Sequence, residues 1–317
     1  MRLRNKAATL QFLLLLCIAV LSILLFLPLS PLSEGGGIGN PNTSVITRVN
    51  VTNAAPYVYN LSIIAPPITL TPNVTTLAWC SAIVEDLNTV ADIFLVNATL
   101  YDKNFSQHNS IDYNTTHYTN SSCTNFSEID TFNRLYNCTF NLWYNSNPGN
   151  WMCNITAADT TGVTDDENIS ITINELIALM VGDLIDFGKV AVLNYSDNIP
   201  FNVTNVGNRN INVSVYAYGA QDNDTLAMVC DYGNISIGNI RVSINSSNIT
   251  SPVDFNTMTI VNNTNATPTR IGNFTILQYN ATYNMSINTS VWRLYVSNAG
   301  RPSGICNGTV VFRALRA

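Results

Sequence analysis

The strongest fold signal in this chain is a stretch near its middle that reads Gly149-Asn150-Trp151-Met152-Cys153-Asn154-Ile155-Thr156-Ala157-Ala158-Asp159. Residues 151–158 predict a β-strand, and residues 135–144 predict a second strand that pairs with it. The intervening segment, Asn145-Ser146-Asn147-Pro148-Gly149-Asn150, is rich in turn-forming residues. We therefore expect a β-hairpin at this point of the chain.

The sequence on the N-terminal side of this hairpin predicts further strands. They are expected at residues 57–64, 75–85 and 93–101, whereas residues 102–133 are polar and predict an irregular loop or short edge strands. No stretch after Leu29 shows sustained helical periodicity. The predicted fold class is therefore all-β.

Four cysteines fall in this region, Cys80, Cys123, Cys138 and Cys153, and they allow three pairings. The spacing of Cys80 and Cys153, one in an early strand and one in the last, resembles the inter-sheet bridge of an immunoglobulin domain. The stretch 149–159 also resembles the F strand of that family, with Trp151 at the place of its corner tyrosine. The resemblance implies an immunoglobulin-like β-sandwich with bridges Cys80–Cys153 and Cys123–Cys138.

A short acidic segment, residues 160–168, predicts a boundary between two such sandwiches, at residues 45–163 and 168–317. Residues 206–209 predict a hairpin turn between strands 201–205 and 210–218. Cys230 and Cys306 are the only cysteines of the second domain and are expected to pair. The other strands of this domain are expected at residues 169–181, 184–192, 239–244, 274–278, 292–296 and 309–314.

Two short motifs in the second domain, Ile185-Asp186-Phe187-Gly188-Lys189-Val190 and Val203-Thr204-Asn205-Val206-Gly207-Asn208, resemble the repeated β-sandwich domain of archaeal envelope proteins. Together with the features of the N-terminus and the asparagines described next, this resemblance implies an archaeal cell-surface glycoprotein.

The N-terminus predicts export through a membrane. Residues 12–29 form an uncharged apolar run, close to the minimum length for a spanning helix. Because residues 1–10 are basic, they are expected to stay in the cytoplasm while the bulk of the chain is extracellular. We expect an uncleaved signal anchor at residues 11–30, a flexible Gly/Pro spacer at 31–44, and no second membrane span.

Two alternatives to the signal anchor remain open. A cleaved signal peptide would be removed after the apolar run. A leader like that of archaeal type IV pilins would be cut before Ala8, because Lys6-Ala7-Ala8-Thr9 resembles the short motif cleaved in that family.

The asparagines predict heavy N-glycosylation. About 26 of roughly 45 asparagines begin an Asn-x-Ser/Thr sequon, whereas chance would give on the order of 8. In five sequons, which begin at Asn50, Asn202, Asn212, Asn234 and Asn273, the middle residue is large and apolar. In a strand this pattern directs the asparagine to solvent and the middle residue to the core. The candidate acceptors are Asn50, Asn73, Asn97, Asn114, Asn202, Asn212, Asn234, Asn273, Asn280 and Asn307.

The sequence contains no recognisable catalytic or cofactor-binding motif. The net charge is −6 and basic residues are scattered, which disfavours a nucleic-acid partner. The two histidines, His108 and His117, are expected to be solvated loop residues rather than zinc ligands. Three carboxylates, Asp165, Asp166 and Glu167, are candidates for a calcium site in the linker, although solvated charges are the simpler interpretation.

The sequence therefore favours a non-enzymatic, membrane-anchored and glycosylated surface protein with a structural, adhesion or cell-contact role. Its expected partners are the membrane, its own glycans, and other surface proteins or further copies of itself. Two alternatives are a pilin-like filament subunit, and an extracellular hydrolase or carbohydrate-binding module. For the last of these, Trp143 and Trp151 are candidates for a sugar platform, although packing in the core or corner is favoured.

Overall fold

The structure is a computed structural model that describes residues 44–64, 66–244, 253–280 and 286–317. The chain divides into two units, residues 1–52 and 53–317. The regular elements of the described residues are β-strands and two short 3-10 turns, η1 (Ile237–Asn239) and η2 (Phe255–Thr257), which confirms the all-β prediction. These residues contain no helix with the length and apolar character needed to cross a bilayer. The predicted anchor at 11–30 lies outside them, as do residues 1–10 and 31–43.

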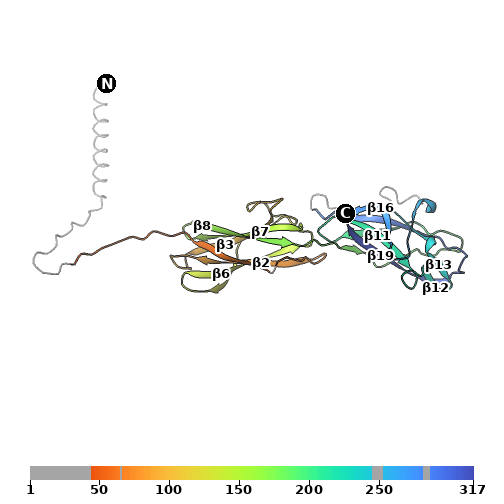
Figure 1. Ribbon diagram of the computed structural model, residues 1–317, viewed down its shortest axis with the longest axis horizontal. Helices are drawn as coiled ribbons and strands as arrows, with labels where there is room; N and C mark the ends of the chain where they lie inside the picture. Colours follow the sequence, from red (N-terminus) through yellow and green to blue (C-terminus); the bar gives the residue numbers. More distant parts are fainter. Residues whose placement is uncertain (1–43, 65, 245–252, 281–285) are drawn as a thin grey trace, which may run out of the picture. The chain divides into compact units, whose positions relative to one another are not determined.

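Within the described part of residues 57–173, two four-stranded antiparallel sheets form an N-terminal sandwich (Figure 1). One sheet has the order β1-β2-β6-β5 and the other has the order β4-β3-β7-β8. The strands are β1 (Tyr57–Ile63), β2 (Thr75–Glu85), β3 (Ile93–Asp102), β4 (His117–Asn120), β5 (Thr124–Glu128), β6 (Asn133–Trp143), β7 (Gly149–Asp159) and β8 (Thr164–Ile173).

The core of this sandwich follows from strict alternation along its strands. In β7 the side chains of Trp151, Cys153, Ile155 and Ala157 are all fully buried, because residues i and i+2 share one face of a strand. The two sheet orders correspond to the A-B-E-D and C′-C-F-G sheets of an immunoglobulin domain, with β7 in the place of strand F. The immunoglobulin-like sandwich predicted for this region is confirmed.

Two details of the predicted strand pairing here are wrong. β6 pairs with β2 and β5, and β7 pairs with β3 and β8, so the predicted hairpin is a crossing from one sheet to the other. Residues 164–168, predicted to lie in a linker, are the first half of β8, which is antiparallel to β7. The carboxylate of Asp165 accepts a hydrogen bond from the Val58 backbone N–H, which gives this acidic segment a place beside β1.

The described residues from 179 onward form a C-terminal sandwich around a second apolar core. Its sheets have the orders β15-β14-β17-β10-β9, β16-β11-β19 and β13-β12-β18. Its strands are β9 (Leu179–Val181), β10 (Ile199–Asn205), β11 (Ile211–Tyr218), β12 (Leu226–Tyr232), β13 (Asn234–Ser236), β14 (Ile240–Ile244), β15 (Thr259–Ile260), β16 (Thr269–Ile276), β17 (Ile287–Leu294), β18 (Ser303–Asn307) and β19 (Thr309–Arg316).

Three predictions for this part differ from the structure. The expected strand at 169–181 is divided between β8 and β9, and residues 184–192 form no strand. The Asp186 carboxylate accepts a hydrogen bond from the N–H of Gly188, whose φ of +69° lies in the left-handed region, so the chain turns there instead of continuing extended. The predicted hairpin between β10 and β11 is also wrong, because these strands belong to different sheets.

The side chain of Asn208 fixes the join between the two sandwiches. This residue is fully buried, and its amide nitrogen donates to the carbonyl oxygens of Ser146 and Asn174, both at 3.0 Å. Its amide oxygen accepts a 2.7 Å hydrogen bond from the Leu176 N–H. One side chain therefore holds the β6–β7 corner and the connecting segment 174–178 together.

Candidate functional site

All three predicted disulfides are present. Cys80–Cys153 joins β2 to β7 across the N-terminal sandwich, and Cys123–Cys138 joins the residue before β5 to β6. Cys230–Cys306 links the adjacent strands β12 and β18, in which the two cysteines are direct cross-strand partners. The first bridge corresponds to the B–F bridge of immunoglobulin domains.

Trp151 forms the corner that the sequence predicted. It is fully buried, two residues before Cys153, and its indole N–H donates to the Asn147 carbonyl oxygen at 2.8 Å. A corner tyrosine makes the equivalent hydrogen bond to the backbone a few residues upstream in immunoglobulin folds. Trp151 is therefore unavailable as a sugar platform, whereas Trp143 is 42% exposed.

The sequon-bearing strands largely follow the predicted pattern. The middle residues of four sequons, Val203, Val213, Ile235 and Phe274, are 0–3% exposed. The fifth middle residue, Val51, is 79% exposed and lies in a segment with no secondary structure. Ser214 is a second departure, because the predicted solvent-facing hydroxyl position of its sequon is fully buried.

Most of the candidate glycan acceptors lie at the surface. Three are half-buried, namely Asn97, Asn234 and Asn280. The others are exposed: Asn50, Asn73, Asn114, Asn202, Asn212, Asn273 and Asn307. Asn154 also begins a sequon but is only 5% exposed, and its amide donates to the Asp166 carboxylate at 2.7 Å. Exposure therefore separates sequons that leave room for a glycan from one that does not.

The histidine prediction is half wrong. His117 is 1% exposed; its Nδ1 lies 2.8 Å from an Asp112 carboxylate oxygen and its Nε2 lies 3.2 Å from the His108 carbonyl oxygen. His108 Nδ1 lies 3.2 Å from the Thr99 hydroxyl. Because residues 102–116 fold back on β3 and β4, His117 is a buried structural residue and not a solvated one.

The calcium candidates do not converge on a common point. Asp165, Asp166 and Glu167 are consecutive in β8, so Asp166 projects from the opposite face to the other two. The carboxylates of Asp165 and Asp166 already accept hydrogen bonds from Val58 and Asn154. Across the described residues, no group of three His, Cys, Asp or Glu side chains is arranged to hold a metal ion.

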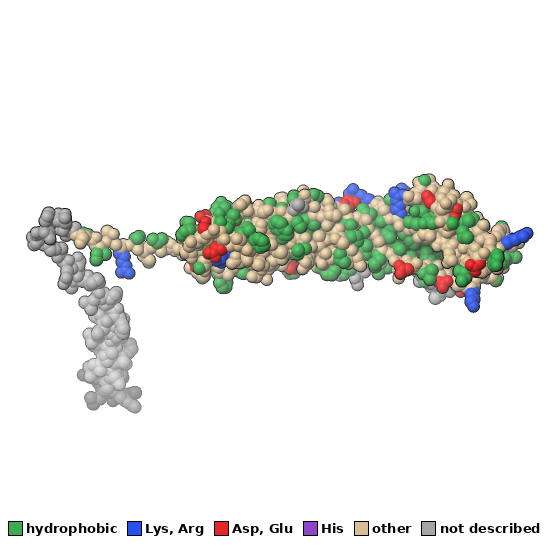
Figure 2. All heavy atoms as spheres, turned by 90° about the horizontal axis from the view of Figure 1, so that it is seen from below, with side chains coloured by type: hydrophobic (Ala, Val, Ile, Leu, Met, Phe, Trp, Pro, Cys, Tyr) green, Lys and Arg blue, Asp and Glu red, His purple; other side chains and the backbone are tan. Residues whose placement is uncertain are grey.

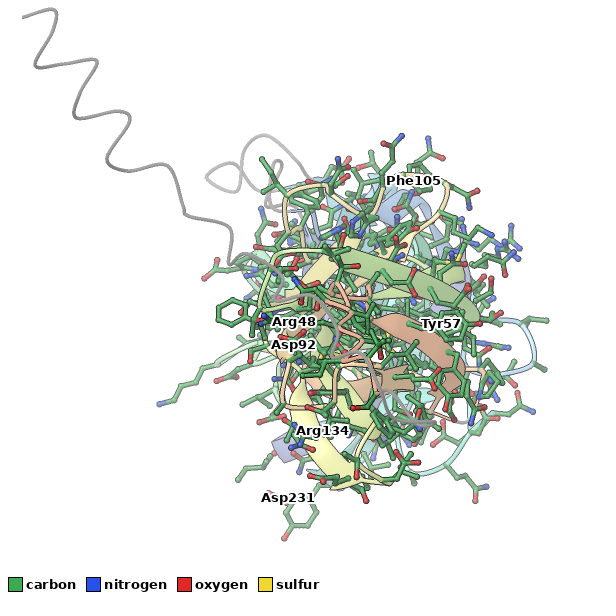
Figure 3. The ribbon with its side chains drawn as sticks, turned by 90° about the vertical axis from the view of Figure 1, so that its left-hand side faces the viewer. Arg48, Tyr57, Asp92, Phe105, Arg134 and Asp231 are labelled. Carbon is green, nitrogen blue, oxygen red and sulfur yellow. A yellow bond between two sulfur atoms is a disulfide. The ribbon has the colours of Figure 1, made fainter. Side chains whose placement is uncertain are left out.

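On the face shown in Figure 2, the charged side chains are few and scattered among hydrophobic and uncharged groups. The four charged residues labelled in Figure 3 come from separate parts of the chain: Arg48 lies before the first strand, Asp92 precedes β3, Arg134 lies in β6 and Asp231 lies in β12. Arg134 is paired with Glu128 at 2.9 Å. Burial raises the pKa of Asp86, a fully buried carboxylic acid near Asp92 and Asp159.

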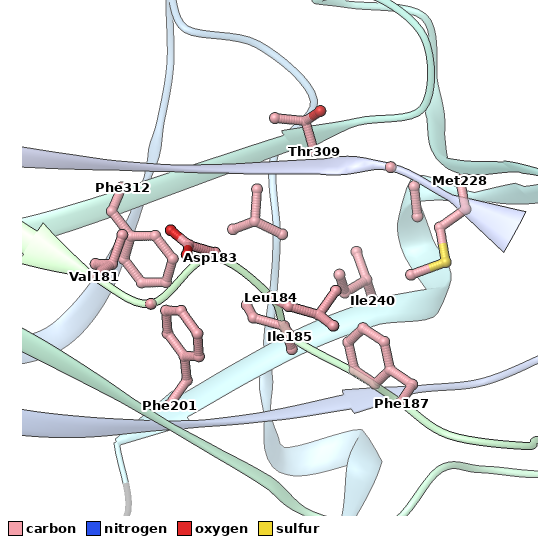
Figure 4. A pocket seen from close by; sticks show the side chains of 14 residues that line it. Val181, Asp183, Leu184, Ile185, Phe187, Phe201, Met228, Ile240, Thr309 and Phe312 are labelled. Carbon is pink, nitrogen blue, oxygen red and sulfur yellow. The ribbon is translucent and has the colours of Figure 1, made fainter.

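The C-terminal sandwich contains a partly open pocket of about 250 Å³, whose wall mixes apolar side chains with polar and backbone groups (Figure 4). Phe201 of β10 and Phe312 of β19 lie on its wall with ring centroids 5.4 Å apart. The non-strand segment 182–187 covers part of it and contributes Leu184 and Phe187. Asp183 is the one ionisable side chain among the residues that line it.

Comparison with known proteins gives no family. No family model matches the chain, and no curated protein matches it. The chain is similar to a chaperone–tip adhesion subunit pre-assembly complex (CsuC-CsuE) from archaic chaperone-usher Csu pili of Acinetobacter baumannii. The identity is 12%, the match covers 80% of this chain and 99% of the other, and the TM-score is 0.34.

Two further solved structures show a similar degree of likeness. One is the titin immunoglobulin tandem A164-A165, with 9% identity, 82% and 96% coverage and a TM-score of 0.21. The other is the C-terminal domain of the AgI/II polypeptide BspA of Streptococcus agalactiae, with 9% identity, 81% and 96% coverage and a TM-score of 0.23. These scores are too low to carry an argument about function.

The strand order, the β2–β7 bridge and the Trp151 corner define the class on their own. The chain is an all-β protein with immunoglobulin-like sandwich architecture and three disulfide bonds.

Proposed function

We propose that this chain is a non-enzymatic, N-glycosylated surface protein of an archaeal envelope, anchored through residues 11–30 with the bulk of the chain outside the cell. Its role is structural or adhesive. The observation that carries the proposal is the arrangement of sequons on strands, in which exposed asparagines alternate with core residues at Asn202-Val203, Asn212-Val213 and Asn273-Phe274. On such a strand one face packs in the core and the other presents asparagines that can accept glycans. This arrangement suits a glycosylated β-sheet protein.

The disulfides support the extracellular part of this proposal. Bridges form and persist in oxidising compartments and are rare in the cytosol of most cells. Each of the three bridges ties together parts of the chain that are distant in sequence, with separations of 73, 15 and 76 residues. The cytosolic proteins of hyperthermophiles are a known exception, so the decisive test must report glycans and location together with the bridges.

The test is glycopeptide mapping of the native protein under non-reducing conditions, combined with membrane fractionation. We expect glycans at the exposed Asn202, Asn212 and Asn273, none at the buried Asn154, and intact bridges in the membrane fraction. Unglycosylated protein in the cytosolic fraction would overturn the proposal, even if its cysteines were paired. Glycan on Asn154 would show that the acceptor positions are not selected by the folded strands.

A further inference from the structure

The outer face of the sheet β1-β2-β6-β5 carries three aromatic side chains. The core residues of β2 and β6 have even numbers, so the odd-numbered residues face outward. Trp79 of β2 and Trp143 of β6 therefore lie on the outer face, and Tyr59 of β1 lies there opposite Ile83. Trp143 is 42% exposed, whereas Tyr59 and Trp79 are half-buried. Tyr59, Trp79 and Trp143 together form the aromatic row.

The strand register places the aromatic row on a straight diagonal. Tyr59 pairs with Ile83, which lies four residues along β2 from Trp79. Trp143 pairs with Thr75, which lies four residues from Trp79 in the opposite direction. Each step crosses one strand and runs four residues along it, which separates the Cα atoms by about 14 Å. The row is about 28 Å long, so a ligand that contacts all three rings must be an extended chain.

The indole N–H groups divide the four tryptophans of the chain into two kinds. Trp151 and Trp292 are fully buried, and their N–H groups donate to protein oxygens at 2.8 and 2.9 Å. Trp79 and Trp143 make no side-chain hydrogen bond to any residue that the structure describes. Because a tryptophan N–H inside a protein usually has a partner, the two outward tryptophans keep a donor available to a ligand.

Uncharged polar side chains lie between these two tryptophans. Thr139 is the cross-strand partner of Trp79, Thr75 is the partner of Trp143, and Asn141 lies between the two pairs on β6. All three polar residues are exposed, and within the described ranges their side chains form no hydrogen bond. A sugar chain offers hydroxyl groups at its edges and C–H groups on its ring faces. Aromatic rings beside hydroxyl and amide groups are complementary to both.

The charge on this face disfavours an anionic chain. Among the outward residues of β2 and β6, Glu85 is the one charged side chain. Single-stranded nucleic acids also stack on aromatic side chains, but their binding sites add a positively charged groove. An acidic polysaccharide would need cations for the same reason. The ligand that fits the face is therefore a neutral chain.

A protein partner fits this face less well than a sugar chain. The centre of a protein interface is a closely packed, largely apolar patch. Here the cross-strand pair of Ser81 and Asn137 separates the apolar pair Ile83 and Leu135 from Trp79. Aromatic contacts are thus spaced along the face instead of forming one continuous apolar centre.

We propose that the aromatic row binds an extended, neutral polysaccharide. Its sugar rings stack on Tyr59, Trp79 and Trp143, and its hydroxyl groups form hydrogen bonds with Thr139 and Asn141. The proposal rests on the proposed function only for its setting, because such a polymer of the envelope or of a neighbouring cell is met outside the cell. Binding is measured on purified protein and location on fractionated cells, so the two can fail separately.

The first test is affinity electrophoresis of the full chain, purified in detergent, in gels that contain hydroxyethylcellulose, galactomannan or arabinoxylan. We expect at least one of these neutral polymers to retard the protein and the anionic polygalacturonate not to. Trp79→Ala and Trp143→Ala should each weaken binding roughly tenfold, because one aromatic contact is lost. Tyr232→Ala removes a 75% exposed ring from the C-terminal sandwich and should bind like wild type.

Trp143→Ala is the decisive variant, because its side chain lies at the surface and its loss leaves the core intact. Its melting temperature should stay close to that of wild type. No retardation of wild type by any of the three neutral polymers would overturn the proposal. So would equal retardation of wild type and a folded Trp143→Ala.

The second test asks whether binding depends on the length of the sugar chain. The probes are the disaccharide and the hexasaccharide of the polymer that binds, and the measurement is isothermal titration calorimetry. The hexasaccharide should bind at least roughly tenfold more tightly, because only a longer chain reaches a second ring about 14 Å away. Trp143→Ala should reduce this advantage. Equal affinity of the two probes would indicate a site for one sugar and contradict the row.

Two further measurements distinguish other occupants of the face. Asn137 begins a sequon here and is half-buried, and a glycan on it would lie over the row. We expect glycopeptide mapping to find Asn137 unmodified. We also expect sedimentation of wild type and Trp143→Ala to be equal. A glycan on Asn137, or self-association that Trp143→Ala weakens and Tyr232→Ala does not, would identify a different occupant and refute the proposal.

Discussion

Cys80 and Cys138 lie directly opposite each other in the ladder between β2 and β6, yet each is bonded to a different cysteine. Cys80 bridges to Cys153 in the facing sheet, and Cys138 bridges to Cys123 beside β5. All four residues belong to one buried cluster. The alternative bridge between Cys80 and Cys138 would join two strands that already pair at eleven positions. It would leave the two sheets without a disulfide between them.

Removing the inter-sheet bridge should therefore cost more than removing its neighbour. Closing a loop of 73 residues restricts the unfolded chain by about 4 kcal/mol, against about 3 kcal/mol for one of 15 residues. We expect the double variant Cys80→Ala/Cys153→Ala to lose more unfolding free energy in denaturant titration than Cys123→Ala/Cys138→Ala. Equal losses would contradict the entropic explanation.

The Trp151 corner can be tested by a change that keeps an aromatic ring. Trp151→Phe removes the indole N–H that donates to Asn147 and leaves unfilled volume in a fully buried site. We expect a loss of about 2–4 kcal/mol of unfolding free energy, measured by chemical denaturation. Trp143→Phe at the exposed neighbouring position is the control and should be close to neutral. If Trp151→Phe leaves the unfolding free energy unchanged, the hydrogen bond and packing of Trp151 do not stabilise the sandwich.

The carboxylate of Asp224 should make the folded protein less stable in acid. Burial opposes its charge, but hydrogen bonds outweigh that effect and hold its pKa below the ordinary value of 3.8; they come from the N–H groups of Ala220, Leu226 and Gln221 and the amide of Asn263. A group whose pKa is depressed by folding stabilises the protein above its unfolded pKa, and the stabilisation is lost as the pH falls below it.

The corresponding experiment is thermal unfolding of Asp224→Asn between pH 7 and pH 2. The variant should melt below wild type at pH 7, and the gap should narrow as the pH falls through about 4. Asp197→Asn, at an exposed position, should match wild type at neutral pH. A gap that stays constant with pH would show that the charge of Asp224 is not the stabilising element.

The Asn208 side chain is expected to be the strongest polar contact at the join of the two sandwiches. Asn208→Ala leaves the Leu176 N–H and the carbonyls of Ser146 and Asn174 without this partner in a buried place. We expect a cost of about 2–3 kcal/mol, visible as a lower melting temperature. The exposed Asn298→Ala serves as the matched control. If the two variants have the same melting temperature, contacts other than those of Asn208 hold the two sandwiches together.

Local composition predicted the positions of several strands but not the strands with which they pair. Residues 75–85 and 309–314 were located closely, because both are rich in the β-branched and aromatic residues that favour strands. The two predicted hairpins failed for one shared reason: a short turn between two strands fits a sheet crossing as well as a hairpin. Only the pairing of β6 with β2, and of β10 with β17, distinguishes the two.

The acidic strand β8 shows a second limit. Its first half, Thr164-Asp165-Asp166-Glu167-Asn168, has the composition of a linker, but as an edge strand it needs few apolar residues. Its carboxylates accept hydrogen bonds from Val58 and Asn154, which are distant in sequence. His117 was missed for the same reason, since its burial depends on Asp112 and the His108 carbonyl and not on any apolar pattern.

The sequence by itself determined the all-β class, the Cys230–Cys306 pair and most of the alternation of sequons with core residues, because each depends on spacing along one strand or on elimination among few candidates. The other two bridges and the Trp151 corner were implied by the resemblance to an immunoglobulin domain. The tertiary structure alone decided which strands share a sheet and that β8 closes one side of the N-terminal sandwich. These properties depend on contacts between residues far apart in the chain. No local pattern in β6 or β10 records that the strand that follows it joins the other sheet.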